Sequence, residues 1–214
     1  VRGSAINNSG TVAAGFSTPS VKAQEDVAAE AINTATISAE SIGYLEMHGS
    51  GSVIGDAIEV SALSRAFRRT MSAGGLCGLG AVKSNVGHLG AAAGMASLCK
   101  TVLALEHNEI PPTILVDQVN PSLGLDESPF HLVLQTEAFP DGRPRRAAAN
   151  SYGIGGTNAH VILEEAPAVA PRQATDGPYI LLLSARTADA LDDMSTRLAA
   201  HLAAHPTVQM ADVA

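Results

Sequence analysis

The chain has 214 residues, of which 46% are hydrophobic, 16% charged and only 3% aromatic, and its formal net charge is −8. This much apolar sequence can bury a core and excludes a disordered chain, while the acidic balance and the lack of Trp disfavour a nucleic-acid partner. No apolar run approaches the roughly 18 residues of a membrane span, the N-terminus lacks a signal-peptide pattern, and two cysteines are too few for a disulfide framework, so we expect a cytoplasmic protein without a membrane partner.

Strands and helices are predicted to alternate from the start of the chain. A helix is expected over 19–35, because Thr18-Pro19 is a start signal, and a buried strand is expected over 42–48. A second helix, over 55–70, has several apolar residues near one face: Ile58, Leu63, Ala66 and Phe67. The short strand "GLGAV" then ends at Lys83.

The pattern continues with a long helix over 90–110, which Pro111-Pro112 should stop. The Ala and Gly content of this helix implies very close packing against its neighbours. A loop rich in Asn and Pro leads to a strand over 130–139, and residues 146–166 have the pattern of two apolar strands around a glycine turn.

The segment 167–178 is Pro-rich, polar and aperiodic, and it predicts a boundary after a main domain of residues 1–166. In the remaining residues, 179–214, "YILLLSA" is expected to be a strand. A helix capped by Thr187 should follow, with one apolar face: Leu191, Met194, Leu198 and Leu202. Strands alternating with helices favour a layered α/β fold.

Two of the seven histidines stand where catalysis is commonly placed. His48 in "EMHGSGSVIGD" and His88 in "KSNVGHLGAAAG" each follow a strand and precede a Gly-rich stretch that opens a helix. The other five have plainer interpretations. Three lie near helix ends and should be exposed, and two lie at strand starts and should be structural: His107, His201, His205, and then His131 and His160.

The glycine loop after His48 does not match the common cofactor motifs. "GSGSVIG" is one residue too long for the dinucleotide fingerprint, and no acidic residue follows about 20 positions later. The loop also lacks the G-K-[ST] ending of a phosphate loop. No pair of His or Cys residues near it has the spacing of metal ligands, so we expect neither a cofactor nor a metal here.

Three ordered motifs resemble the downstream motifs of β-ketoacyl synthases, most closely the ketosynthase domains of modular polyketide synthases. They are "HGSGSVIGDAIEV", "VKSNVGHLGAAAG" and "NSYGIGGTNAHVILEEAP", and "LLLSARTADAL" resembles the linker that follows such a domain. The resemblance implies a thiolase-like layered α/β fold, with residues 1–166 as its second pseudo-symmetric half and 179–214 as the beginning of the linker domain.

The resemblance also implies a decarboxylative Claisen condensation of an acyl thioester with a malonyl-type extender on an acyl carrier protein. It assigns the two catalytic histidines to His48 and His88, whose N–H groups would stabilise an enolate oxygen. Lys83 matches the family's lysine, and Glu59 matches the acidic residue that pairs with it. The backbone amide of Ile154 matches an oxyanion donor for the thioester carbonyl.

The same resemblance gives the glycine loop after His48 a role in receiving the phosphopantetheine arm of the carrier protein. Ser50 and Ser52 stand where the family usually has Thr, so their hydroxyls are expected to bind the arm's amides. Tyr152 stands where Phe is common and would border the acyl channel, and Gly155 belongs to the glycine turn beside it.

The nucleophilic cysteine of the family has no counterpart here. Cys77 lies just ahead of a strand, and Cys99 on a helix is expected to be a buried, inert thiol. The cysteine elbow is expected upstream of residue 1, in an N-terminal half on the same or a separate chain. A homodimer and adjoining polyketide synthase domains are implied as further partners. The alternative is a non-condensing partner that binds a carrier protein or shapes a pocket, although the presence of both histidines and Lys83 favours catalysis.

Overall fold

The computed structural model describes every residue except 14, 72–76, 168–177 and 214. The chain forms two compact units, Val1–Ala166 and Pro167–Ala214, and each is described by itself. The expected boundary segment, 167–178, lies almost wholly outside the described residues.

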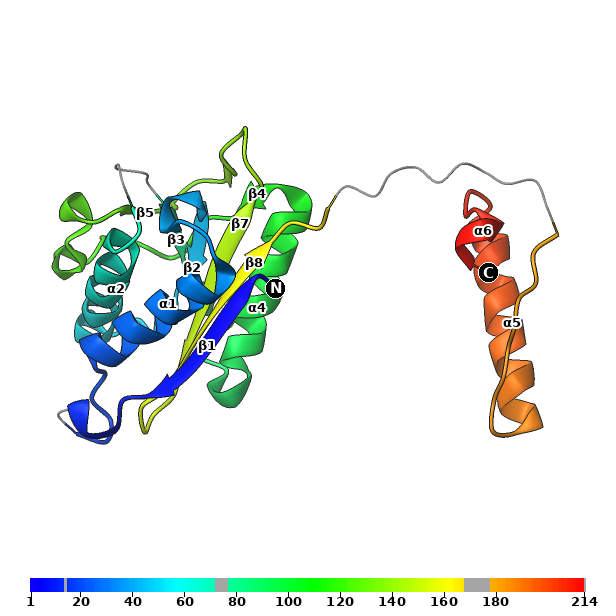
Figure 1. The fold of residues 1–214 in the computed structure, drawn as a ribbon, viewed down its shortest axis with the longest axis horizontal. Helices are drawn as coiled ribbons and strands as arrows, with labels where there is room; N and C mark the ends of the chain where they lie inside the picture. The colour runs from blue at the N-terminus through cyan, green and yellow to red at the C-terminus, as the bar shows by residue number, and fades with distance from the viewer. Residues whose placement is uncertain (14, 72–76, 168–177, 214) are drawn as a thin grey trace. The chain divides into compact units, whose positions relative to one another are not determined.

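A six-stranded mixed sheet forms the centre of the first unit (Figure 1). Its order is β1-β8-β7-β2-β3-β5, and the neighbours among β7, β2, β3 and β5 are parallel, whereas β8 is antiparallel to both β7 and β1. The strands are β1 (Gly3–Asn8), β2 (Tyr44–Glu46), β3 (Cys77–Gly80), β5 (Phe130–Leu132), β7 (Arg146–Tyr152) and β8 (Thr157–Glu164).

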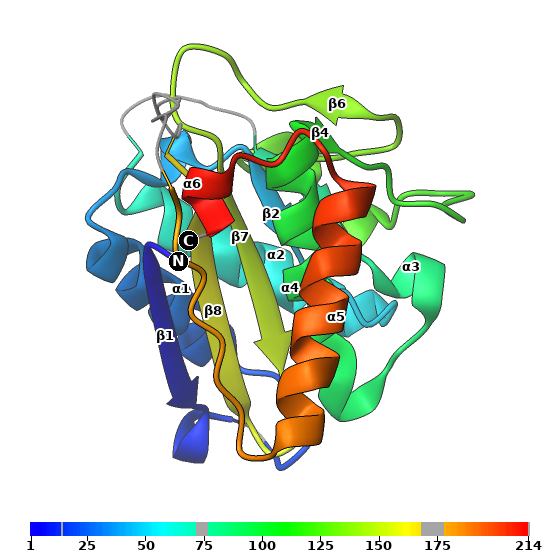
Figure 2. The same cartoon turned by 90° about the vertical axis from the view of Figure 1, so that its right-hand side faces the viewer.

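Helices cover both faces of this sheet, as the layered prediction requires. On one face lie α1 (Val21–Ala35) and α2 (Val53–Arg68), and on the other lies α4 (Ala93–His107) (Figure 2). The strand residues alternate between the two cores: Leu45 packs with α1 and α2, whereas its neighbour Tyr44 packs with α4. This alternation follows from the two-residue period of a strand.

The helix ends are set by local chemistry. Ser20 and Ser52 cap α1 and α2, because each hydroxyl accepts a hydrogen bond from a backbone N–H of the first turn. The predicted stop of the 90–110 helix is wrong. Helix α4 ends at His107, where Asn108 adopts a left-handed conformation with φ of 56°, three residues before Pro111.

Several short elements differ from the sequence predictions. The 130–139 segment is two strands in two sheets, since β6 (Glu137–Ala138) leaves β5 and pairs with β4 (Glu109–Ile110). Strand β1 was not predicted, although it pairs with β8 over its whole length. The remaining elements are α3 (Lys83–Val86) and the 3-10 helices Gly10–Val12, Ala39–Ser41, Gly90–Ala92, Pro121–Leu123 and Leu125–Glu127.

The second unit contains the helices α5 (Ala188–Ala204) and α6 (Met210–Val213). Thr187 caps α5 as predicted, accepting a hydrogen bond of 3.2 Å from the backbone N–H of Ala190. The predicted strand over 179–185 is wrong. These residues form no strand, and the described residues of this unit contain no other strand with which they could pair. No helix among the described residues is both long and apolar enough to cross a membrane.

Candidate active site

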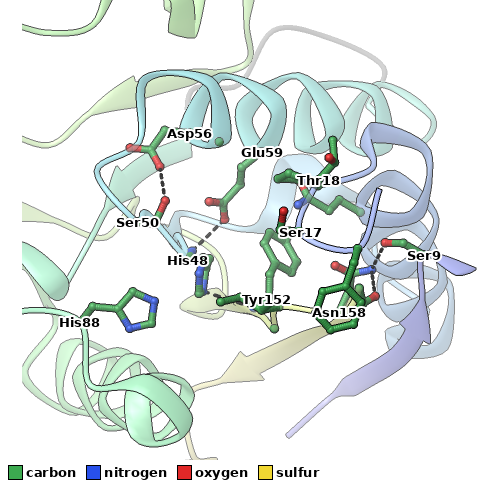
Figure 3. Close-up of a pocket in the computed structure, with 17 residues that line it drawn as sticks. Ser9, Ser17, Thr18, His48, Ser50, Asp56, Glu59, His88, Tyr152 and Asn158 are labelled. Atoms are coloured by element: carbon green, nitrogen blue, oxygen red, sulfur yellow. Dashed lines mark hydrogen bonds between the residues drawn. The ribbon is translucent and has the colours of Figure 1, made fainter. Parts of the chain in front are cut away.

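The two candidate histidines lie side by side at one edge of the sheet. His48 follows β2 and His88 lies in the loop after α3, which itself follows β3. Since β2 and β3 are adjacent and parallel, their carboxyl ends meet at the same edge. The imidazole centroids are 5.5 Å apart with the rings nearly perpendicular, at 77° (Figure 3). The two glycine-rich loops that sequence analysis singled out thus meet at one site.

A cavity of about 240 Å³ opens beside these rings. Its walls come from α1 and α2, from the two histidine loops, from the segment before α1 and from the turn between β7 and β8. The lining includes His48, His88, Glu59, Tyr152 and Ile154. With Ser50, which also lines it, the structure places in one cavity six of the residues that sequence reasoning selected from separate motifs.

Backbone hydrogen bonds fix the tautomer of both imidazoles. Nδ1 of His48 accepts a bond of 3.2 Å from the backbone N–H of Tyr152, and Nδ1 of His88 accepts one of 3.0 Å from Gly90. A nitrogen that accepts carries no proton, so each neutral ring carries its proton on Nε2. Burial, together with Lys83 and His88, lowers the pKa of His48 to about 4, which keeps this ring neutral near pH 7.

Glu59 of α2 holds the loop that carries His48. Its carboxylate accepts bonds from the backbone N–H of His48 at 2.7 Å, from Gly49 at 3.0 Å and from Asn150 Nδ2 at 2.8 Å. The residue is only 2% exposed, and burial raises its pKa to about 7 despite these three donors. Burial thus moves the titration of this carboxyl group toward neutral pH.

Lys83 approaches the same loop from the opposite side. Its ammonium group donates to the backbone carbonyl of His48. Burial lowers the pKa of this half-buried lysine, against the attraction of Glu59, Glu46 and Asp56. The predicted direct pairing of Lys83 with Glu59 is wrong: within the described chain these two side chains form no ion pair. Lys83 binds the backbone carbonyl of His48 and Glu59 binds its backbone N–H, so the two side chains interact with each other only through their charges.

The turn between β7 and β8 presents a backbone amide to the cavity. Ile154 lines it with a side chain that is 86% exposed, and its N–H donates to none of the described residues. The turn needs glycine, because Gly155 and Gly156 have φ of 96° and 88°. Gly155 also donates 3.2 Å to the carbonyl of Phe16, which ties the turn to the segment before α1.

The three remaining candidates, Tyr152, Ser50 and Ser52, have different surroundings. The ring of Tyr152 is 5.6 Å from that of His48, and its buried hydroxyl has no hydrogen-bond partner among the described residues. Ser50 lines the cavity and lies 3.4 Å from Asp56 Oδ1. Ser52 caps α2 through a 3.3 Å bond from the N–H of Gly55, so its hydroxyl has a structural partner that the sequence reasoning did not foresee.

Sequence reasoning missed the groups behind Glu59. Asn150 and His160 are each 1% exposed, and His160 Nδ1 lies 2.6 Å from Asn150 Oδ1 while the amide of Asn150 reaches Glu59. They are paired across β7 and β8. The structural interpretation of His160 is thus confirmed, but its link to the site was not predicted. A polar residue in an otherwise apolar strand was the available signal.

The two cysteines differ in exposure. Cys77 is buried within β3, and burial raises the pKa of its thiol. The prediction that Cys99 is buried is wrong, because it lies on an exposed face of α4. No group of three or more His, Cys, Asp or Glu side chains among the described residues has the arrangement of a metal site.

Comparison with known proteins identifies the family. Residues 1–117 match the model of the beta-ketoacyl synthase C-terminal domain, and residues 120–214 match that of the ketoacyl-synthetase C-terminal extension. The chain is 46% identical to a component of the phenolphthiocerol/phthiocerol polyketide synthase of Mycobacterium tuberculosis, covering 100% of this chain and 15% of that protein. It is 43% identical to the erythronolide synthase EryA3 of Saccharopolyspora erythraea, covering 98% and 7% respectively.

Solved structures agree. The oxazolomycin ketosynthase domain OzmH KS7 of Streptomyces albus JA3453 is 39% identical with a TM-score of 0.79, covering 100% of this chain and 39% of that one. The ketosynthase from module 1 of the bacillaene synthase of Bacillus amyloliquefaciens FZB42 is 40% identical, also with a TM-score of 0.79, covering 100% and 38%. The chain thus spans a minor part of each relative. Its layered sheet has the thiolase-like fold of these domains, and the chain belongs to the beta-ketoacyl synthase family of polyketide synthases.

Proposed function

We propose that the chain supplies the two-histidine half of a ketosynthase that catalyses decarboxylative Claisen condensation. Residues 1–166 would be the C-terminal half of the domain and 179–214 the beginning of the linker that follows. The observation that carries this proposal is the pair of neighbouring imidazoles, both with Nδ1 held by a backbone N–H. Both rings therefore keep an Nε2–H free of that contact, available to donate to a single oxygen.

The first chemical step is the loss of carbon dioxide from a malonyl-type thioester. As the bond between Cα and the carboxylate breaks, its electron pair moves into the thioester carbonyl and produces an enolate oxyanion. Two Nε2–H donors, from His48 and His88, would stabilise this charge as it develops. Donors aimed at a developing oxyanion in a water-poor site are commonly the largest single catalytic contribution.

The second step forms the carbon–carbon bond. The enolate carbon attacks the carbonyl of an acyl group held as a thioester on the cysteine expected in the upstream half. The resulting tetrahedral oxyanion would accept from the free N–H of Ile154. The C–S bond then breaks, the cysteine thiolate leaves, and a 3-oxoacyl thioester remains on the carrier protein.

Lys83 and Glu59 act as positioning residues in this proposal. Lys83 binds the backbone carbonyl of His48 and Glu59 binds its backbone N–H, so the histidine is held through both of its own backbone polar groups. Neither side chain needs to touch the substrate. The lysine cation also lowers the pKa of His48, which favours the neutral ring that the mechanism requires.

The extender would be delivered by the phosphopantetheine arm of an acyl carrier protein. Ser50 supports this route, because it lines both the histidine cavity and a second cavity of about 520 Å³ on the other side of the glycine loop. The arm would pass this hydroxyl with its thioester directed at His48, and Gly155 would border the reacting end. The binding of the arm by Ser52 stays a prediction. So do a homodimer, adjoining synthase domains and a cytoplasmic location.

The test uses the complete domain, in which the upstream half is joined to this chain. We expect His48→Ala and His88→Ala each to slow release of carbon dioxide from a malonyl carrier protein by about 100-fold or more. Transfer of an acyl group to the domain, read by intact mass, should remain. His107→Ala, on the exposed end of α4, is the matched control. A wild-type domain that binds carrier protein without acylation or decarboxylation would instead establish a non-condensing partner.

A further inference from the structure

A fully buried carboxylate lies beneath the site without a role in the mechanism above. Glu46, the last residue of β2, is 0% exposed. Its Oε1 accepts a hydrogen bond of 2.5 Å from the backbone N–H of Val82, and its Oε2 accepts one of 2.5 Å from the hydroxyl of Tyr44. The ammonium group of Lys100, on α4, lies 2.9 Å from Oε2.

The Val82 contact connects Glu46 to the active site. Val82 directly precedes Lys83, whose ammonium group binds the carbonyl of His48. The start of the segment that carries Lys83 is thus fixed by one side chain of β2. Lys83 itself returns to His48, which lies only two residues after that side chain. Glu46, Lys83 and His48 therefore form a closed set of contacts in which Glu46 fixes the backbone just before the lysine.

The Lys100 contact gives this buried side chain a partner of opposite charge. A buried carboxylate is stable only when it is paired and its oxygens are hydrogen-bonded, and Glu46 meets both conditions. Lys100 is itself only 12% exposed at its side chain. Because α4 follows the His88 loop, the same ion pair joins the helix after one histidine to the strand before the other.

We propose that Glu46 is a positioning residue for the condensation, which fixes the Lys83 loop through the Val82 amide so that Lys83 can hold His48. This inference rests on the proposed function. The contrasting interpretation is a buried ion pair that only joins α4 to the sheet. The positioning role requires Oε1 of Glu46, or another acceptor in its place, for the Val82 N–H. The contrasting interpretation requires only that the interior between α4 and the sheet is well packed.

Paired substitutions separate these two interpretations. Either single variant would leave its partner's charge buried and unpaired, so both residues are changed together. Glu46→Gln with Lys100→Met keeps a carbonyl oxygen for the Val82 N–H and an NH2 group for the Tyr44 hydroxyl. Glu46→Leu with Lys100→Leu fills the same space with apolar groups and removes the acceptor. Tyr44→Phe is the matched control, since it removes a partner of Oε2 and leaves the Val82 contact.

The complete domain is assayed for acylation, for decarboxylation and for amide exchange of the peptide covering 81–87. We expect the Leu pair to acylate normally but to decarboxylate about 10- to 100-fold more slowly, with faster exchange in that peptide. The Gln–Met pair and Tyr44→Phe should stay close to wild type in all three assays. Normal decarboxylation by the Leu pair, or an equal loss in the Gln–Met pair, would overturn the positioning role. A wild-type domain that does not decarboxylate would instead overturn the proposed function, and amide exchange would still report on the Val82 contact.

Discussion

The side chain of Glu59 is bonded to the backbone of His48, with 2.7 Å between Oε1 and the N–H nitrogen. A helix that packs on one face of the sheet thereby fixes a loop at the sheet's edge. The carboxyl group is 2% exposed, and burial raises its pKa to about 7. Its protonation state is consequently linked to the stability of the fold as well as to the geometry of the site.

We expect the stability of the complete domain to fall as pH rises from about 4.5 to about 7 on account of Glu59. The folded state holds the proton more tightly than the unfolded state, so this contribution is fully present below the unfolded pKa and is lost as pH rises through the folded one. A shift of this size corresponds to on the order of 3 kcal/mol. Denaturant unfolding at several pH values measures it.

Glu59→Gln should flatten this pH dependence, because a carboxamide of the same shape does not titrate. Glu106→Gln, at an exposed position on α4, is the control and should leave the dependence unchanged. An identical pH dependence in the wild type and in Glu59→Gln would show that Glu59 ionises in the folded domain as it does in the unfolded chain.

The pKa of His48 gives a prediction of the opposite sign. Burial and Lys83 lower it from 6.5 to about 4, so the ring should stay neutral as pH falls through the range in which a free histidine gains its proton. The corresponding stability is present above the unfolded pKa and is lost as pH falls through the folded one. With 13C-labelled histidine, NMR should show two rings that titrate near pH 4, because burial also lowers the pKa of His160 to about 4, and one of the two signals should disappear in His48→Ala. A titration of the His48 ring near 6.5 would contradict the buried, neutral imidazole.

Much of the site could be predicted because it depends on topology. The convergence of His48 and His88 follows from two adjacent parallel strands that each end in a glycine-rich loop, and such loops are visible in the sequence. The exposure of Cys99 could not be predicted, because a helix that is apolar around most of its circumference does not indicate which side faces outward. The chain of contacts behind Glu59 depends on the pairing of Asn150 with His160, which only the register of β7 and β8 defines.

That pairing leads to a prediction about Asn150. Its amide donates to Glu59 and its carbonyl oxygen contacts His160, so Asn150→Ala leaves two buried polar groups short of a partner. We expect a loss of about 1–3 kcal/mol in the free energy of unfolding and slower decarboxylation. Asn158→Ala is an informative comparison, because it also removes a buried amide from the neighbouring strand, one that binds Asn7, Ser9 and Gly156 instead of Glu59. Equal effects of the two variants on decarboxylation would mean that Asn150 acts only on stability.

The glycine turn offers a test of the Ile154 amide. A Cβ at Gly156 would lie 2.9 Å from the Cβ of Ser9, at a φ of 88° that side chains rarely adopt. Gly142 has a similar φ of 78° but faces open space. We therefore expect Gly142→Ala to cost about 1–2 kcal/mol of stability from backbone strain alone. Gly156→Ala should cost more and should also slow the condensation step in the complete domain, because the turn must move. Unimpaired condensation in Gly156→Ala would argue that the Ile154 amide is not a donor in that step.

The last prediction concerns the chain without an upstream half. Helix α4 exposes large apolar side chains, with Met95 60%, Leu103 52% and Val102 39% accessible. Several exposed large apolar side chains on one helix are typical of an interface. We expect the isolated chain to self-associate in sedimentation experiments, and Met95→Glu combined with Leu103→Glu to reduce that association. A charge pair placed elsewhere on an exposed helical surface, Ala199→Glu with Ala203→Glu on α5, is the matched control and should not reduce it.

The same sample tests whether the chain can accept an acyl group by itself. Cys77 is buried, and burial raises the pKa of its thiol. Cys99 is exposed on α4 and is not among the residues that line the histidine cavity. Because a thiol needs thiolate character and an adjacent base to act as a nucleophile, incubation with an acyl thioester should leave the intact mass unchanged. Cys99→Ser separates a trace of surface acylation from a reaction at the site. Stoichiometric acylation that survives Cys99→Ser, or a monomer that unfolds cooperatively without its partner, would contradict the half-domain proposal, because the nucleophile or the missing packing surface would then lie within these 214 residues.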